Sequence, residues 1–416
     1  MTSKKNKVII VGAGIAGLSV AKLLKQAGLE ILIIEASNKI GGRVCTESKN
    51  GFLLDKGFQV LLSAYPLAQE LLDYESLNLK PFLPGAKILH QQGITEIMDP
   101  LRKPSSFFKT LISPAGSLGD KFQMLKLKKS LEKKSIEEIF NEPEQTTDSY
   151  LLKLGFSDKM IEWFFRPFLG GIFLERDLIT SSRMFNFVFK MFSEGDTVIP
   201  EKGMGEIPKQ LASCFSEDEI IFNKAVVFVD KGEVKTIDGN SLHADYVVIA
   251  TDEIHLPSPY KTITRKHREV TNLYFTAFNK PFKDQVIALN ANKEALVNNI
   301  AVMNNIAKAY SSSGEALISV SILREVSAIA TEKLAEMVKK ELSIWFEDAK
   351  QWQFLERYDI SYALPNQNSV SGEPTEQVLK LDERIYRCGD FLTNGSINAA
   401  MWSGKKVSQL ILKDII

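Results

Sequence analysis

The sequence predicts an α/β fold, in which separated parts of the chain build one nucleotide-binding domain around a second, inserted domain. Three observations carry this prediction. VIIVGAGIAGLSVA places a glycine-rich turn between a strand-like run and a helical pattern. ADYVVIATD, residues 244–252, reads as a strand that returns to the first sheet. IYRCGDFLTNGSINAAMWSG adds a last strand, turn and helix near the chain end. A Rossmann-type domain is the fold that combines these parts.

The elements follow in order along the chain. A strand at residues 8–11, a helix at 15–27 that Gly28 closes, and a strand at 31–34 favour a right-handed crossover and a parallel pair. Residues 81–192 are expected to be mostly helical, without a further unit of this kind. Strands are predicted again within residues 220–251. Apolar and alternating runs between residues 271 and 323 predict an antiparallel sheet, followed by a helix over 328–345.

The change of pattern along the chain predicts the domain boundaries. Residues 1–75, 200–255 and 375–416 are assigned to the nucleotide-binding domain. Residues 76–199 and 256–374 are assigned to an inserted, mixed α+β substrate domain. A chain of 416 residues is long enough for two such domains.

Composition argues against several classes of partner. Lys+Arg and Asp+Glu both number 51, so no overall positive charge attracts nucleic acid. Cys45, Cys214 and Cys388 lie far apart, and the four histidines lack metal-ligand spacing. No apolar run approaches the ~18 residues of a membrane span. We therefore expect reduced thiols, no metal, no nucleic acid and a cytoplasmic location.

The glycine-rich turn predicts a dinucleotide site. Gly12 allows the tight turn, Gly14 lets the backbone approach a diphosphate, and Gly17 permits close helix packing. Ile15 and Ala16 begin the helix, whose N-terminal amides favour phosphate. Glu35, followed by Ala36, stands where an acid accepts hydrogen bonds from an adenosine ribose. These features suit either NAD or FAD.

Two further motifs favour FAD. Arg43 follows Gly41 and Gly42, and its guanidinium group is suited to forking two hydrogen bonds to a diphosphate. Gly389 and Asp390 end the last strand, and Asp390 is placed to bind a ribityl hydroxyl group. The amides near Ile397 and Asn398, at the start of the last helix, would direct positive charge at a flavin pyrimidine edge.

Together, GAGIAG, IGGRV, AVVFVD with VVIATD, and CGDFLTNGSINAAMWSG resemble the flavin-containing amine oxidase superfamily. The superfamily includes amine oxidases, protoporphyrinogen oxidases and carotenoid desaturases. The resemblance implies an FAD-dependent oxidoreductase with Val226 by the adenine. It also implies that Gly57, Phe58 and Gln59 approach the flavin. Cys388 lies inside the flavin-binding strand and turn, so we expect the FAD to be non-covalent.

The substrate is expected to be a small, hydrophobic molecule that loses hydride to flavin N5. Amine oxidases of the superfamily often carry a lysine near N5, where this chain has Leu273, Tyr274 and Phe275. ALPNQN resembles the desaturase and protoporphyrinogen oxidase branches more closely, and it follows Tyr362, a candidate pocket wall. Phe185, Phe189 and Phe192 are candidates for an apolar substrate channel, or alternatively for a phenylalanine-rich core. The sequence identifies no catalytic residue.

The sequence is also compatible with two other functions. One is an amine or polyamine oxidase of the same superfamily. The other is a flavin-free binder of a lipidated protein, because Rab GDP-dissociation inhibitors resemble this fold.

A lysine-rich helix is also predicted over residues 121–134. Met124, Leu127 and Leu131 share one of its faces. This pattern fits a solvated amphipathic helix or, as the alternative, a helix that makes peripheral contact with a membrane surface.

Overall fold

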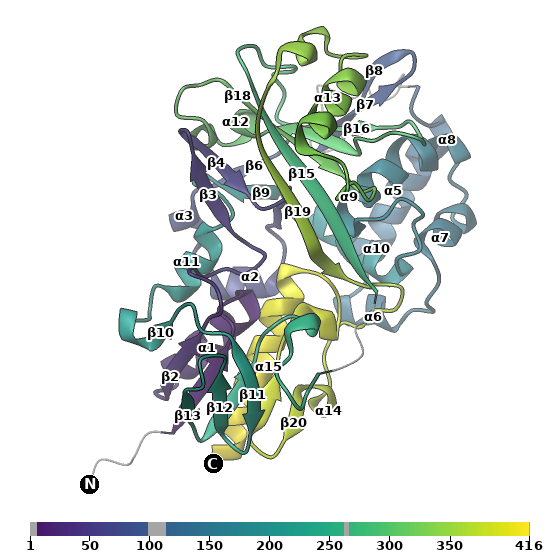
Figure 1. The fold of residues 1–416 in the computed structure, drawn as a ribbon. Coiled ribbons are helices and arrows are strands. Elements are labelled where there is room, and N and C mark those ends of the chain that lie inside the picture. Colours follow the sequence, from purple (N-terminus) through teal and green to yellow (C-terminus); the bar gives the residue numbers. More distant parts are fainter. Residues whose placement is uncertain (1–5, 99–113, 262–265, 416) are drawn as a thin grey trace.

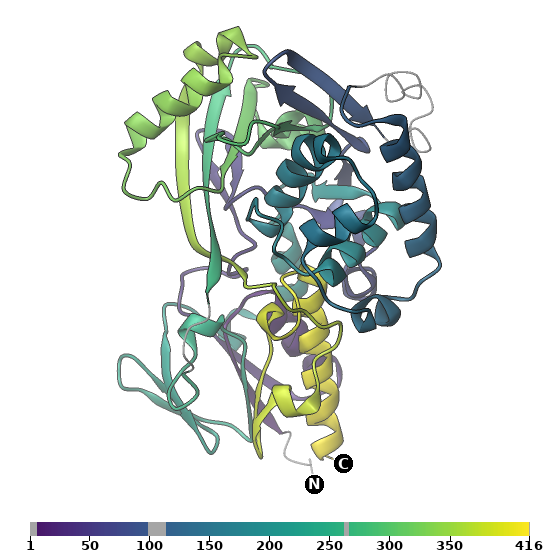
Figure 2. The ribbon, with the colours of Figure 1, turned by 90° about the vertical axis from the view of Figure 1, so that its right-hand side faces the viewer.

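The fold has two regions that the chain crosses several times (Figure 1). A computed structural model describes residues 6–98, 114–261 and 266–415. One region contains α1, α15 and a parallel sheet, and the other contains a long, twisted sheet with helices on its faces (Figures 1 and 2). The predicted α/β class is confirmed. Among the described residues, no helix is long and apolar enough to cross a membrane.

A six-stranded sheet forms the base of the first region. Its order is β10-β2-β1-β14-β21-β20, and all neighbours are parallel except the last pair. The strands are β1 Lys7–Val11, β2 Glu30–Ile34, β10 Ile220–Ile221, β14 Tyr246–Ile249, β20 Lys380–Asp382 and β21 Ile385–Arg387. In register, Ile10 faces Ile33 on β2 and Val248 on β14. The predicted return of a strand to the first sheet is therefore confirmed.

Two helices of this region pack unusually close together. α1 spans Ile15–Gln26 and α15 spans Ile397–Ile415, so the predicted N-terminal and C-terminal helices are confirmed. A Cβ atom on Gly404 would lie 2.7 Å from the Ala16 carbonyl oxygen. The small residues of the last helix thus let the two ends of the chain lie side by side.

A smaller sheet lies beside the parallel one, close to the end of β2. It consists of β11 Val226–Asp230, β12 Glu233–Thr236 and β13 Ser241–His243. The Lys224 amide, just before this sheet, donates a hydrogen bond to the Glu35 carbonyl at 2.9 Å. This contact fixes Val226 near the acid that ends β2.

The second region is built on a seven-stranded sheet in the order β19-β15-β18-β17-β16-β7-β8. Its strands are β7 Gly85–His90, β8 Gly93–Met98, β15 His267–Ala277, β16 Ile287–Asn290, β17 Asn299–Val302, β18 Ala316–Ile322 and β19 Gln353–Pro365. The antiparallel sheet predicted over residues 271–323 is confirmed in β15 to β18. The pair of β16 with β7 is parallel.

Part of the helical prediction for residues 81–192 was wrong. β7 and β8 form a hairpin that Gly93 turns at φ +131°, with Lys87 opposite Glu96. The apolar side chains of β7 gain their burial by pairing with β16, which is about 200 residues away in the chain. That distant pairing outweighs the local helical pattern. The helices after residue 114 are confirmed.

β19 was not predicted, although it is the longest of these strands. It pairs antiparallel with β15, but the register shifts twice, between Arg268 and Val270 and between Tyr274 and Phe275. Such irregularities break the two-residue alternation that would mark a strand in sequence.

Helices cover both faces of the seven-stranded sheet (Figure 2). α13 Thr331–Leu342, within the helix predicted over residues 328–345, packs with Leu273 and Phe275 in one core. On the other face, α9 Arg166–Phe173 packs Phe168 against Ile88 and Leu289. The remaining α-helices of the described ranges are α2 Pro66–Leu71, α3 Tyr74–Leu77, α5 Leu118–Glu132, α6 Ile136–Asn141, α7 Thr147–Lys153, α8 Asp158–Met160, α10 Ser182–Glu194, α11 Glu206–Ala212, α12 Met303–Ile306 and α14 Glu376–Leu379.

Short strands connect the two regions. They are β3 Thr46–Lys49, β4 Phe52–Asp55, β5 Leu61–Leu62, β6 Leu79–Pro81 and β9 Thr197–Pro200. β3 pairs with β4, and β9 pairs with both β5 and β6. Chain segments from both predicted domains meet in these pairs; the boundaries themselves stay a prediction.

Candidate functional site

The three glycines of the first turn have different structural roles. Gly12 has φ +105°, and a Cβ atom there would lie 2.9 Å from the Ala250 carbonyl oxygen. On Gly17, a Cβ atom would lie 2.1 Å from the Gly12 carbonyl oxygen. On Gly14, it would meet nothing within 4 Å among the described residues. The fold itself thus requires the first and third glycines, whereas Gly14 leaves room for a ligand.

The second glycine motif lies directly on the first. The Gly41 amide donates a hydrogen bond to the Ala13 carbonyl at 2.8 Å. Gly41 and Gly42 both have positive φ, of +111° and +59°. A Cβ atom on Gly42 would lie 3.4 Å from the Gly14 Cα atom. The two motifs therefore form one surface, which carries Arg43 beside the glycine turn.

Glu35 ends β2 beside the same turn. Its Oε2 accepts a hydrogen bond from the Ala13 amide at 2.7 Å, and its Oε1 accepts bonds from the Ser37 amide and hydroxyl group. A carboxylate has about four lone-pair sites, so it can still accept hydrogen bonds from ribose hydroxyl groups. Ala36, the next residue, is exposed.

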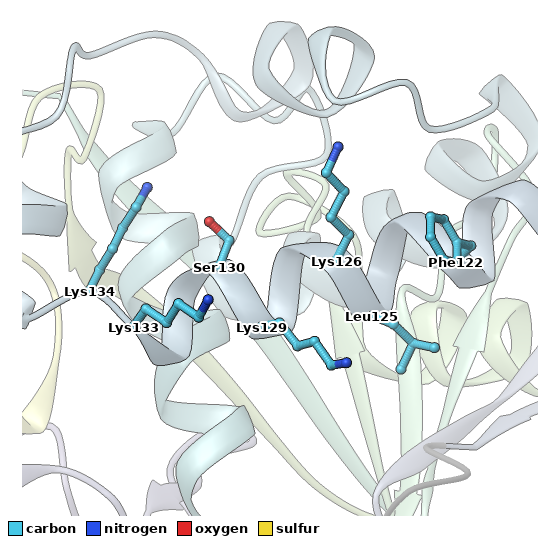
Figure 3. A pocket seen from close by; sticks show the side chains of 7 residues that line it. All are labelled: Phe122, Leu125, Lys126, Lys129, Ser130, Lys133 and Lys134. Atoms are coloured by element: carbon cyan, nitrogen blue, oxygen red, sulfur yellow. The ribbon is translucent and has the colours of Figure 1, made fainter.

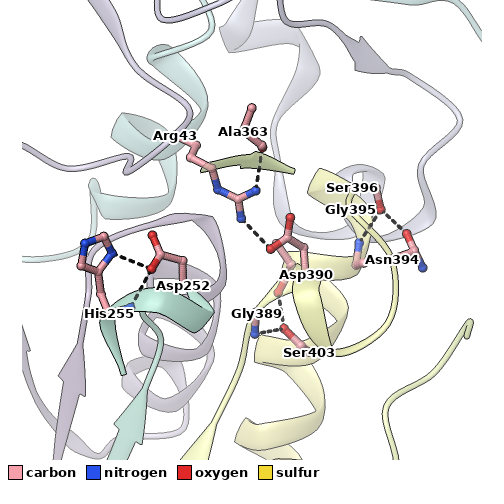
Figure 4. Close-up of polar contacts among 12 residues, drawn as sticks. Arg43, Asp252, His255, Ala363, Gly389, Asp390, Asn394, Gly395, Ser396 and Ser403 are labelled. Atoms are coloured by element: carbon pink, nitrogen blue, oxygen red, sulfur yellow. Dashed lines mark hydrogen bonds and ion pairs between the residues drawn. The ribbon is translucent and has the colours of Figure 1, made fainter. Parts of the chain in front are cut away.

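Arg43 and Asp390 form an ion pair across 347 residues of chain (Figure 4). The Arg43 Nη2 to Asp390 Oδ1 distance is 2.5 Å, and Arg43 Nη1 donates to the Ala363 carbonyl at 3.0 Å. Burial alone would lower the pKa of Arg43, but the adjacent Asp390 carboxylate leaves that pKa raised overall. Arg43 is thus held in its charged form, and one side of its guanidinium group is already occupied.

The strand, turn and helix at the chain end hold Asp390 in place. The Gly389 amide donates to Ser403 Oγ of α15 at 2.9 Å (Figure 4). Ser396 caps the helix by accepting a bond from the Ala399 amide at 3.0 Å. The amides of Ile397 and Asn398 have no partner among the described residues, so they keep their donors for a ligand.

The Asn398 side chain has a structural task as well. Its Oδ1 accepts a hydrogen bond from the Leu67 amide, in the first turn of α2, at 3.1 Å. It therefore ties α15 to α2 and fixes the start of α15.

Gly57, Phe58 and Gln59 follow β4, and Gln59 contacts the backbone of Arg43. Gln59 Nε2 donates to the carbonyl groups of Arg43 and Lys56, at 2.7 and 3.0 Å. Gln59 Oε1 and the Thr251 hydroxyl group are buried without a hydrogen-bond partner in the described structure. Gly57 has φ +88°, and a Cβ atom there would lie 3.1 Å from Ile360. Unpaired buried polar atoms are costly, so these two fit a site that a polar ligand completes.

Tyr362 lies beside Arg43. Its ring centre is 5.5 Å from the Arg43 guanidinium carbon and 5.1 Å from the His267 ring. Burial raises the pKa of Tyr362, so its hydroxyl group stays protonated at neutral pH. The structure brings Tyr362 to the Arg43–Asp390 pair, a placement that the sequence did not indicate.

The candidate apolar residues of α10 differ in burial. Phe185 is 0% exposed and packs against Tyr150, Phe165 and Phe189. It therefore belongs to the core, which was the alternative interpretation. Phe189 and Phe192 are only partly buried, and the Phe192 ring lies 5.4 Å from that of Phe168.

Asp55 was missed by sequence reasoning. It is 0% exposed and accepts hydrogen bonds from the Thr46 hydroxyl group at 2.5 Å, the Tyr310 hydroxyl group at 2.6 Å and the Met204 amide at 3.0 Å. Burial raises the pKa of Asp55 to about 6, against the effect of these donors. The available signal was its place at the start of the DKGFQ stretch, two residues before Gly57.

Comparison with known proteins agrees with this geometry. The family model described as flavin containing amine oxidoreductase matches residues 15–412. The chain belongs to this family. Protoporphyrinogen oxidase 2 of Arabidopsis thaliana is 28% identical over 168 residues, or 40% of this chain. That match spans about a third of the relative, 32% of its length.

Solved structures share the fold. An oxidoreductase from Methanosarcina mazei has a TM-score of 0.75 at 17% identity, covering 97% of this chain and 100% of that one. Cyclohexylamine oxidase from Brevibacterium oxydans has a TM-score of 0.69 at 16% identity, covering 99% of both chains. At such identity the likeness concerns the fold alone.

The cofactor of this flavoprotein is FAD, bound non-covalently. The flavin-free alternative, a binder of lipidated proteins, is therefore wrong. Cys45 and Cys388 are both buried, while Cys214 is exposed. Within the described ranges, no cluster of three or more His, Cys, Asp or Glu side chains could hold a metal ion.

Replacing Arg43 tests the ion pair. In Arg43→Ala, Asp390, whose side chain is 6% exposed, would lose its partner. We expect the apoprotein to lose about 1 to 2 kcal/mol of stability, a value reduced for the 33% exposure of Arg43. FAD affinity should fall as well. Urea denaturation of the apoprotein and FAD titration measure the two effects.

The double variant Arg43→Ala with Asp390→Asn is the control. It removes the unpaired charge, so it should regain apoprotein stability and keep the weak FAD binding. Wild-type FAD affinity in Arg43→Ala would show that Arg43 does not contact the cofactor.

Proposed function

We propose that this flavoprotein oxidises a small, predominantly apolar organic molecule, which loses hydrogen across a carbon–carbon or carbon–nitrogen bond. The reaction type is that of desaturases and protoporphyrinogen oxidases. FAD, when bound, supplies the hydride acceptor at N5. The protein contributes binding, orientation and electrostatic stabilisation.

The cofactor roles proposed for the chain follow the motifs. Gly12, Gly14, Ile15, Ala16 and Gly17 would hold the diphosphate at the α1 N-terminus, with Arg43 and Gly42 on its other side. Glu35 and Ala36 would bind the adenosine ribose, and Val226 would lie by the adenine. Asp390, with Gly389, would accept a bond from the ribityl chain, and Gly57, Phe58 and Gln59 would approach the flavin ring. We further propose residues 1–75, 200–255 and 375–416 as the cofactor domain.

The start of α15 would raise the reduction potential of the bound flavin. Its two unpaired amides, of Ile397 and Asn398, carry the positive end of the helix dipole. Such an interaction stabilises nearby negative charge by about 1 to 2 kcal/mol. This corresponds to roughly 20 to 45 mV in a two-electron potential.

The apolar substrate class rests on an aromatic row made of Phe164, in the π-helical turn Ile161–Phe165 before α9, Phe168 of α9 and Phe192 of α10. Phe164 stacks on Phe168 at 5.2 Å, and Phe168 lies 5.4 Å from Phe192. All three side chains are only partly buried, and Phe164 and Phe168 pack against the seven-stranded sheet. Because these rings keep part of their surface exposed, they favour a ligand that buries apolar area, at roughly 25 cal/mol per Å².

The residues of β15 support the same class of apolar substrate. Leu273 and Phe275 face the α13 core, and Tyr274 is fully buried with its hydroxyl group bound to the Asp55 carbonyl at 2.9 Å. None of the three offers the lysine that amine oxidases often place near N5. The second candidate, an amine or polyamine oxidase, is favoured by the family description, flavin containing amine oxidoreductase.

A comparison of substrates separates the two candidates. Porphyrinogens and polyenes should bleach the FAD absorbance faster than small primary amines, because a protonated amine must lose its charge or find a partner in an apolar site. Anaerobic stopped-flow spectroscopy on the holoenzyme measures the rates. Faster bleaching by small amines than by any apolar compound would make the protein an amine oxidase instead.

A further inference from the structure

The outer side of α5 exposes large apolar side chains. Leu118 is 65% exposed, Phe122 is 71% exposed and Leu125 is 36% exposed. Their spacing of four and three residues places them on one face of the helix. Figure 3 shows Phe122 and Leu125 on the same helix as a group of lysines.

Lysines occupy the C-terminal half of the same face of α5. Lys126, Lys129 and Lys133 are exposed, and they have no acidic partner among the described residues. With Phe122, Leu125, Ser130 and Lys134 they line a shallow groove of about 610 Å³ (Figure 3). Lys134 pairs with Glu142, and Glu132 is the exposed acid at the helix end. The outer face is thus apolar toward the N-terminus of α5 and basic toward its C-terminus.

The inner side of α5 is fixed to the protein. Leu127 and Leu131 are 3% and 0% exposed. Asp120 completes a capping box with Ser117 and also accepts bonds from the Ser157 amide and hydroxyl group, both at 2.7 Å. The apolar face expected from the sequence, with Met124, Leu127 and Leu131, lies toward the core, so it is not free to contact a membrane. The opposite face is the available one.

We propose that the outer face of α5 docks on an anionic lipid membrane. Exposed Phe and Leu side chains can enter the boundary between headgroups and acyl chains, while the lysines bind anionic headgroups. The protein as a whole has zero net charge, so the attraction is local to this face. An acidic polymer such as nucleic acid would use the lysines but would gain little from the apolar half.

Vesicle flotation of the full-length holoenzyme tests the proposal. Vesicles of phosphatidylcholine with about 30% phosphatidylserine should carry the protein upward, and pure phosphatidylcholine should not. Binding should fall at least about fivefold between about 0.1 M and about 0.5 M NaCl. Phe122→Ser, and separately Lys126→Gln with Lys129→Gln and Lys133→Gln, should each reduce binding at least about fivefold.

Matched control variants lie on another surface. Phe278 is 90% exposed, and Lys333, Lys340 and Lys350 are exposed. Phe278→Ser, and the triple lysine-to-glutamine variant at these positions, should float like the wild type. Equal losses in the controls, no flotation of the wild type, or binding to polyglutamate with no binding to vesicles would each overturn the proposal.

Discussion

Gly14→Ala is expected to lower FAD affinity about 100-fold, or about 2.7 kcal/mol, while the apoprotein keeps its stability. The added methyl group would meet no atom of the described residues within 4 Å, and Gly14 has φ −76°, which any residue can adopt. The methyl group would instead occupy the space through which the diphosphate approaches the backbone. The loss should therefore appear in cofactor binding alone.

Gly17→Ala is the matched control for this prediction. There the methyl group would stand 2.1 Å from the Gly12 carbonyl oxygen, so the turn itself must shift and the apoprotein should lose stability. FAD titration and urea denaturation of both apoproteins separate the two effects. Wild-type FAD affinity in Gly14→Ala would place the diphosphate elsewhere.

Asp55→Asn is expected to remove a pH dependence of stability. The folded state raises the pKa of Asp55 from 3.8 to about 6, so it favours the protonated carboxyl group. The stabilisation that comes from this preference for the protonated form is complete at a pH below the pKa of Asp55 in the unfolded chain. It is lost as the pH rises through about 6, the pKa in the folded state. The loss is about 3 kcal/mol for a shift of this size.

The asparagine can keep the local hydrogen bonds. Asp55 Oδ1 accepts from Thr46 and the Met204 amide, and an asparagine amide group in the place of Oδ2 could donate to the Tyr310 oxygen. We therefore expect the free energy of unfolding of the variant, relative to the wild type, to rise by about 2 kcal/mol between pH 4 and pH 7, because the unfolded carboxyl group is already partly ionised at pH 4.

Urea denaturation with saturating FAD, at a series of pH values, measures this difference. Asp177→Asn, at an exposed position, is the control and should show no such rise. A constant difference for Asp55→Asn across the range would mean that Asp55 titrates alike in the folded and unfolded states.

The sequence alone determined the elements whose signals are local. The glycine turn, the strands on either side of α1 and the capped start of α15 each depend on residues within one short stretch, and all lie where they were expected. The family and its cofactor also followed from such short motifs, because the order and spacing of the motifs can be read from the sequence without knowledge of the fold.

Only the tertiary structure decided which distant residues meet. β7 and β19 are strands because β16 and β15 pair with them, and two register shifts hide the alternation of β19. Arg43 reaches Asp390 across the parallel sheet, and Asp55 is buried by Tyr310 from the second region. The hydrophobic pattern of a segment indicates which of its own residues are buried. Hydrogen bonding, charge pairing and desolvation depend instead on partners that only the folded chain brings together.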